Sequence, residues 1–81
     1  MRKISSSTEM SFIKIIETYP DEYVLVRITA LDHNKGKEAG VALYASTSRD
    51  ELSAVSRHGS IVGDSIILEG ENLLPVLGGL L

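Results

Sequence analysis

The stretch EYVLVRITAL, residues 22–31, is the strongest predicted β-strand in the chain and decides the fold. Its side chains alternate between a wholly apolar face and a mixed face. The apolar face carries four residues: Val24, Val26, Ile28 and Ala30. The other face has Arg27 and Thr29 in its middle. We therefore expect the first face to meet the core and the second face to be wetter.

A polar, turn-forming segment at residues 32–38 follows this strand and predicts a hairpin. A four-residue loop at residues 33–36 leads into a second strand at residues 39–46. This register brings six apolar side chains onto one face, with Val41 opposite Ile28, Leu43 opposite Val26 and Ala45 opposite Val24. A slip of one residue would place Tyr44 and Ser46 on that face instead, so we expect the first register.

A helix is predicted before the hairpin, at residues 8–18. Ser6 and Glu9 have the spacing of a capping box, and apolar residues recur at helical spacing after them. Pro20 ends this helix, because the residue before a proline is pushed toward extended geometry.

A second helix is predicted at residues 49–58, and a third strand at residues 65–69. Ser48 and Glu51 form a second capping box, and Gly59 suits the carboxyl end of the helix. The strand sequence SIILE is apolar on both faces, which indicates coverage by a helix, a partner chain or the end of the chain.

These elements predict a single α+β domain over residues 1–81 with the layout α-β-β-α-β. A right-handed crossover carries the third strand to the free side of the first. The result is a small three-stranded antiparallel sheet with the order 2-1-3 and both helices on one face. Residues 1–7 are expected to form a flexible N-terminal tail, with Met10 as an alternative natural start. Residues 72–81 are expected to form an apolar C-terminal tail.

Composition excludes several classes of protein. The 81 residues have a net charge of −3, which argues against nucleic-acid binding through broad phosphate contact. The chain has no cysteine, so it forms no disulfide or thiolate metal site, and a cytoplasmic location is favoured. No segment approaches the roughly 20 apolar residues of a membrane span.

No residue pattern predicts catalysis. No serine lies in a Gly-x-Ser-x-Gly elbow, and His33 and His58 lie at predicted polar ends of elements. Residues 32–38 resemble the start of a calcium loop, but the glycine falls one place early and no carboxylate closes the loop. We therefore predict no catalytic, cofactor-binding or metal-ligating residues, and a protein that is not an enzyme.

The C-terminal tail and the sheet edges are the candidate contact surfaces. Three interpretations of the tail stay open: it closes the core, contacts a second copy, or touches a membrane surface. Strand edges also pair readily with other chains, and a three-stranded sheet leaves two of them open. The tail residues selected as a candidate partner contact are Leu73, Leu74, Val76, Leu77 and Leu80.

The segment YPDEYVLV, residues 19–26, resembles a group of small, mostly uncharacterised bacterial proteins that open with a short helix and a Tyr-Pro-x-Glu-Tyr-Val-Leu segment. Residues 40–46 and 48–52 are similar to their second strand and helix start. The resemblance extends over residues 10–69, and the apolar tail departs from it. It implies a companion role beside toxin-like or protease-like partners, with no catalytic residues.

These features predict a non-enzymatic accessory or protein-interaction module that self-associates as a homodimer. One alternative is a small ligand-binding protein or enzyme with a pocket between hairpin and helix, using Arg27, Arg49 and His58. Another is an antitoxin-like partner of a neighbouring gene product. Whether a small molecule binds is left open.

Overall fold

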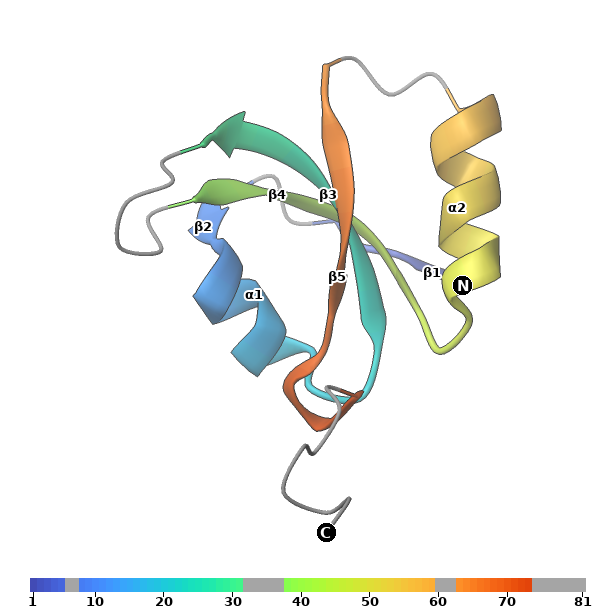
Figure 1. The fold of residues 1–81 in the computed structure, drawn as a ribbon, viewed down its shortest axis with the longest axis horizontal. Coiled ribbons are helices and arrows are strands. Elements are labelled where there is room, and N and C mark those ends of the chain that lie inside the picture. Colours follow the sequence, from blue (N-terminus) through green and yellow to red (C-terminus); the bar gives the residue numbers. More distant parts are fainter. Residues whose placement is uncertain (6–7, 32–37, 60–62, 74–81) are drawn as a thin grey trace, which may run out of the picture.

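The computed structural model describes residues 1–5, 8–31, 38–59 and 63–73. It is an α+β fold with two helices and one antiparallel sheet, in which the strand order is β1-β4-β3-β5 and β2 also pairs with β4 (Figure 1). The elements in chain order are β1 (Arg2–Lys3), β2 (Met10–Ser11), α1 (Phe12–Thr18), β3 (Tyr23–Ala30), β4 (Ala39–Ser46), α2 (Arg49–His58), β5 (Ser65–Glu69) and the short 3-10 helix η1 (Glu71–Leu73).

The predicted three-stranded sheet and its α-β-β-α-β layout are wrong, because the sheet has five strands. The three predicted strands are its centre, β4-β3-β5, in the predicted order of neighbours. The two further strands come from the beginning of the chain. β1 pairs with β4 near Ala45, although these residues were expected in a flexible tail, and β2 pairs with β4 at Gly40. Strands of two residues are too short to show an alternating pattern in sequence.

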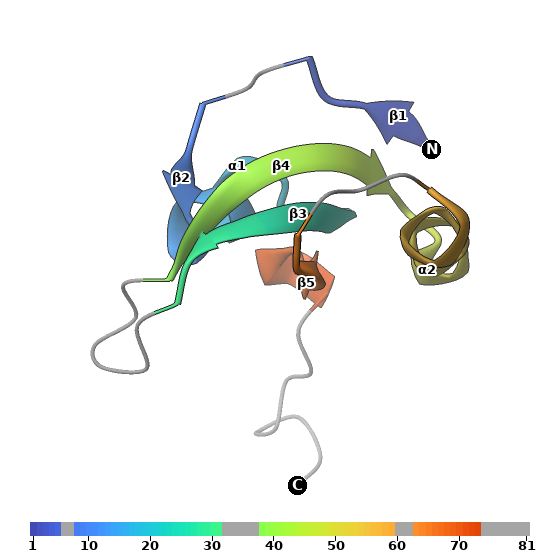
Figure 2. The same cartoon turned by 90° about the horizontal axis from the view of Figure 1, so that it is seen from above.

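The helices lie on opposite faces of the sheet, not on one face as predicted (Figures 1 and 2). Ile15 of α1 belongs to a buried cluster with Val24 and Val26 of β3. Leu25, between those two valines, points to the other face, because successive side chains of a strand alternate. Leu25 and Leu52 of α2 are both fully buried, and α2 contacts β3, β4 and β5. The second face of β3, expected to be wetter, is therefore a second half of the core.

The polar residues of the second face of β3 explain why its burial under α2 was not predicted. Arg27 is half-buried and Thr29 is exposed, and both lie in the half of β3 nearer the hairpin loop. The half-strand at the other end, from Val24 to Val26, is buried on both faces. A single strand thus changes from two-sided burial to partial exposure along its length.

The hairpin register contains a β-bulge. Val24 lies opposite Ala45 as predicted, but Val26 lies opposite Ala42. Leu43 is the extra residue in β4, so the pairing nearer the loop shifts by one residue. Ile28 consequently lies opposite Gly40 and not Val41. The predicted loop at residues 33–36 lies outside the described residues.

The boundaries of the other elements differ in how well they were predicted. α1 begins at Phe12 rather than near residue 8, and its cap is Ser11, whose hydroxyl accepts a hydrogen bond from the Lys14 N–H at 3.1 Å. The predicted cap Ser6 lies outside the described residues. The predicted bounds of α2 and β5 are confirmed. Gly63, just before β5, has a φ of 92°, a left-handed conformation that favours glycine.

Candidate functional site

β5 is the outermost strand on one side of the sheet. It pairs with β3 from Ser65 opposite Arg27 to Glu69 opposite Tyr23. Figure 1 looks onto β5, with α1 to one side of it and α2 to the other, and Figure 2 shows the same strand at the end of the sheet. Within the described part of the chain, no strand pairs with the outer edge of β5.

Two hydrogen bonds identify which backbone groups of β5 face outward. The Ile28 N–H donates to the Asp64 carbonyl at 2.8 Å, and the Gly70 N–H donates to the Glu22 carbonyl at 2.9 Å. Hydrogen-bonded and non-hydrogen-bonded pairs alternate in an antiparallel ladder, so the even-numbered residues of β5 bond to β3. The N–H and C=O groups that face away from β3 belong to Ser65, Ile67 and Glu69.

The side chains of β5 alternate between the two halves of the core. Leu68 packs against the cluster on the α1 face, while Ile66 on the same face is 39% exposed. On the α2 face, the Ser65 hydroxyl lies 3.1 Å from the Ser56 hydroxyl. The strand sequence SIILE also has strong β propensity, and its only charged residue is Glu69 at the end.

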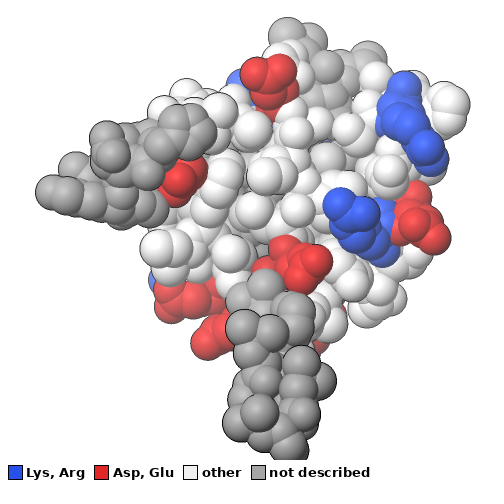
Figure 3. Space-filling view, viewed as in Figure 1, with Lys and Arg blue, Asp and Glu red and all other residues white. Residues whose placement is uncertain are grey.

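Charged residues border this edge and leave its middle uncovered. In Figure 3 the centre of the surface over β5 is white, so none of the described residues there is Lys, Arg, Asp or Glu. Acidic side chains lie above and below it, and basic side chains lie on the side of α2. Proteins commonly protect edge strands with charges, prolines or bulges. The stretch from Ser65 to Leu68 has no charged residue and no proline, and its pairing with β3 shows no register shift.

The opposite edge of the sheet is occupied. β1 pairs with β4 at one end and β2 pairs with it at the other. Between them, the Ile4 N–H donates to the Leu43 carbonyl at 2.9 Å, beside the bulge. Of the two open edges that the sequence predicted, β4 is paired on both sides, whereas no strand among the described residues pairs with the outer side of β5.

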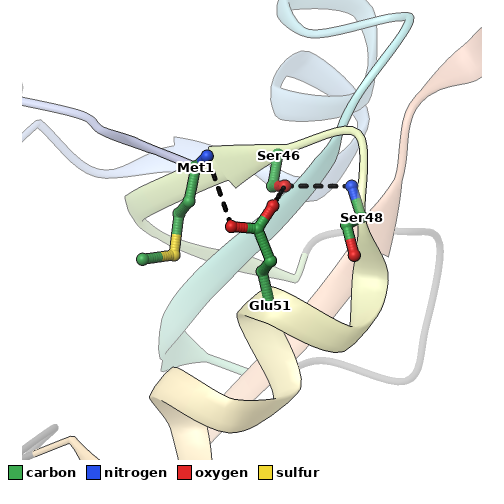
Figure 4. Close-up of polar contacts among 4 residues, drawn as sticks. All are labelled: Met1, Ser46, Ser48 and Glu51. Atoms are coloured by element: carbon green, nitrogen blue, oxygen red, sulfur yellow. Dashed lines mark hydrogen bonds and ion pairs between the residues drawn. The ribbon is translucent and has the colours of Figure 1, made fainter.

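A polar cluster lies at the start of α2 (Figure 4). The Ser46 hydroxyl donates to the Glu51 carboxylate at 2.9 Å and accepts a hydrogen bond from the Ser48 N–H at 2.9 Å. The Met1 amino group lies 3.6 Å from the other carboxylate oxygen. The predicted capping box does not form, because the Ser48 side chain makes no capping hydrogen bond. The Ser46 hydroxyl instead bridges the Ser48 N–H and the Glu51 carboxylate, so the cluster is explained by fixing the start of the helix.

The residues considered for a ligand pocket are not gathered in one place. Arg49 and His58 are the first and last residues of α2, about 14 Å apart along the axis of a ten-residue helix. His33 lies outside the described residues. In the described ranges, no group of three His, Asp or Glu side chains could hold a metal ion. No helix in the same ranges is long and apolar enough to cross a membrane.

The predicted tail contact is described only at its beginning. Leu73 ends η1 and is 36% exposed. The Asn72 N–H donates to the Pro20 carbonyl at 2.8 Å, and its side-chain amide donates to the Asp21 carboxylate at 2.7 Å. The tail therefore starts from a turn that is fixed against the connection between α1 and β3. The other selected residues lie outside the described residues: Leu74, Val76, Leu77 and Leu80.

Comparisons of the chain with models of protein families, with curated proteins and with solved structures found no match. The resemblance noted for residues 19–26 therefore stays a prediction. The candidate site stands on the geometry of β5 alone.

Proposed function

We propose that the protein is a non-enzymatic interaction module that binds another polypeptide by adding a strand to β5. The observation that supports this most directly is the outward-facing backbone of Ser65, Ile67 and Glu69 on an uncharged, apolar strand. In strand addition, main-chain hydrogen bonds give affinity and alternate side chains give selectivity. The net charge of −3 favours a protein partner over nucleic acid, and the lack of cysteine supports a role in the cytoplasm.

The size of the edge limits what kind of partner it can hold. Three outward residues exchange up to six hydrogen bonds with a paired strand. At about 0.5 to 1.5 kcal/mol net each, these contribute roughly 3 to 9 kcal/mol. Association costs about 4 to 15 kcal/mol in lost freedom, which offsets most or all of this gain over most of the two ranges. The partner must also bury apolar surface, and the exposed side chain of Ile66 is the place where it can do so.

A selection from a library of displayed linear peptides tests the proposal. We expect enriched peptides to contain alternating β-branched residues and to bind the protein through β5. Ile67→Pro removes an outward N–H without removing a hydrogen bond to β3, so we expect it to weaken these peptides at least tenfold. Ile67→Val is the matched control, because it trims the same side chain and keeps the N–H.

Ser65→Pro removes a second outward N–H at the first position of the strand, where proline is tolerated, and serves if Ile67→Pro does not fold. Circular dichroism confirms that each variant is folded. A selection that enriches no peptide for a monomeric protein, or peptides that bind the folded proline variants as tightly as the wild type, would overturn the proposal.

A further inference from the structure

We infer that the polypeptide added to β5 is the β5 strand of a second copy of this chain, antiparallel to the first, around a two-fold axis at Ile67. This inference rests on the proposed function and names its partner. A symmetric interface uses the same surface patch on both subunits, so the strand must be complementary to itself. The register, the charges and the apolar side chains of β5 each meet that requirement.

The register follows from which groups face outward. With Ile67 on the axis, Ile67 pairs with Ile67 of the second copy and Ser65 pairs with Glu69. These are all hydrogen-bonded pairs, so every outward N–H and C=O of β5 in both copies finds a partner. A two-fold axis at Ser65 or at Glu69 leaves part of those groups unpaired.

The charges that border β5 fall opposite uncharged residues in this register. Asp64 lies opposite Gly70 of the second copy, and Glu69 lies opposite Ser65. Glu71 lies opposite Gly63. A parallel arrangement would instead place Glu69 beside Glu69, and like charges directly opposite one another are destabilising.

The α2 face adds a favourable charge contact. Glu69 of the second copy lies on this face beside Ser65, because directly opposed residues share a face of the sheet. The Ser65 hydroxyl contacts Ser56, in the last turns of α2, and the helix ends in Arg57 and His58. The incoming carboxylate therefore approaches the basic end of the helix.

The apolar side chains of the two strands also match on the α1 face. Ile66, 39% exposed in the single chain, lies opposite Leu68 of the second copy, and the symmetry repeats this pair on the other side of the axis. Cβ atoms of directly opposed residues are about 4.5 to 5.5 Å apart. Leu68 already packs against the cluster that contains Ile15. The two α1-side cores therefore join across the axis, and Ile66 gains the burial that the isolated edge lacks.

The solution mass and a set of disulfide cross-links test the inference, and the absence of cysteine in the natural sequence makes each introduced thiol unique. We expect light scattering over a tenfold concentration range to show a dimer. Ile67→Pro is expected to weaken self-association at least tenfold while the protein stays folded.

The cross-links report the register. Ile67→Cys alone should form a disulfide-linked dimer on mild oxidation, because directly paired residues have Cα atoms within the 4.4 to 6.8 Å that a disulfide requires. Ser65→Cys alone should not, since its symmetry mate is four residues along the strand, about 13 Å away. The double variant Ser65→Cys with Glu69→Cys should restore cross-linking.

A monomer at every concentration would overturn this inference, as would a Ser65→Cys protein that cross-links as readily as Ile67→Cys. If the protein is monomeric but β5-dependent peptides are still selected, strand addition stands and its partner is a different chain. If neither peptides nor a dimer are found, both the proposed function and this inference fail.

Discussion

Replacing Ser46 with alanine distinguishes two accounts of how α2 begins. The sequence pattern assigns the cap to Ser48 through the Ser-x-x-Glu spacing, whereas in the structure the Ser46 hydroxyl holds both the Ser48 N–H and the Glu51 carboxylate. Ser46 is 3% exposed, so water does not readily replace its hydroxyl. We expect Ser46→Ala to be clearly destabilising and Ser48→Ala to be nearly neutral.

The magnitude follows from the two hydrogen bonds. The bond from the Ser48 N–H contributes about 0.5 to 1.5 kcal/mol, and a bond to a charged group contributes about 1.5 to 3 kcal/mol when buried. The Glu51 side chain is 50% exposed, so its share is smaller, and the total is about 2 kcal/mol. For a chain of this size, that loss lowers the melting temperature by roughly 8 to 16 °C. Ser48→Ala should cost less than about 0.5 kcal/mol.

Urea denaturation of the two alanine variants measures these values. Asp50→Asn is the control for charge alone, because Asp50 is an exposed acid in the same first turn of α2. A double-mutant cycle of Ser46→Ala with Glu51→Gln should give a coupling energy of at least about 0.5 kcal/mol. Equal losses in Ser46→Ala and Ser48→Ala, or a loss below about 0.5 kcal/mol in Ser46→Ala, would refute the reasoning.

Three further changes test other parts of the fold. Leu52→Ala should lower the free energy of unfolding, measured by urea denaturation, by about 2 to 5 kcal/mol, because Leu52 is fully buried on the α2 face. Ile13→Ala, at a site that is 56% exposed, should lower it by less than about 0.5 kcal/mol, and equal effects of the two changes would contradict the two-sided core. Gly63→Ala should lower the free energy of unfolding by about 1 to 2 kcal/mol because the φ of Gly63 is 92°, although nothing lies within 4 Å of the added carbon. D-alanine at the same position, introduced by chemical synthesis, should be tolerated, and an equal loss with D-alanine would point to another cause. Arg2→Ala should lower the free energy of unfolding by less than about 1 kcal/mol, because the ion pair of Arg2 with Glu22 is partly exposed. High salt should remove most of the difference in stability between this variant and the wild type, and a larger, salt-independent loss would show that Arg2 acts through packing.

The parts of the fold that were predicted carry strong local signals. α2 has two acidic residues in its first turn and two basic residues in its last, and its predicted bounds are confirmed. β5 is a short apolar run that begins just after a left-handed glycine, Gly63. Such signals lie within a few residues of the element that they define, so one sequence is enough to find them.

The parts that were missed depend on residues far apart in the chain. β1 exists because Arg2–Lys3 meet Tyr44 and Ala45, and a pair of residues carries no period of its own. The bulge at Leu43 is equally invisible locally, yet it moves the partner of Val26 by one residue. The face covered by α2 was also missed, because β3 is apolar on both sides only over Val24–Val26 and the polar residues farther along suggested an open face.

The sequence predicted the kind of surface that β5 offers, an open strand edge, without selecting β5 itself. Sequence reasoning predicted that strand edges would be open to other chains, and it gave more weight to the leucines of residues 72–81. Which edge is free depends on where the first eleven residues lie, and that is a tertiary contact. The signal that points to β5 is its lack of charge from Ser65 to Leu68, a negative feature that gains meaning only once the strand is known to be outermost.

If the proposed β5-to-β5 dimer forms, the pairing of β1 and β2 with β4 has a consequence for the number of copies in the assembly. If both sides of the sheet were open, β5 of one molecule could join β4 of the next, and such head-to-tail contacts would continue into a fibre. Residues Arg2–Lys3 and Met10–Ser11 already occupy the outer side of β4, so this heterologous contact is blocked. A β5-to-β5 contact uses up the edge of both molecules and stops at two. In the proposed dimer, the pairing of the N-terminal residues with β4 would therefore limit the assembly to two copies.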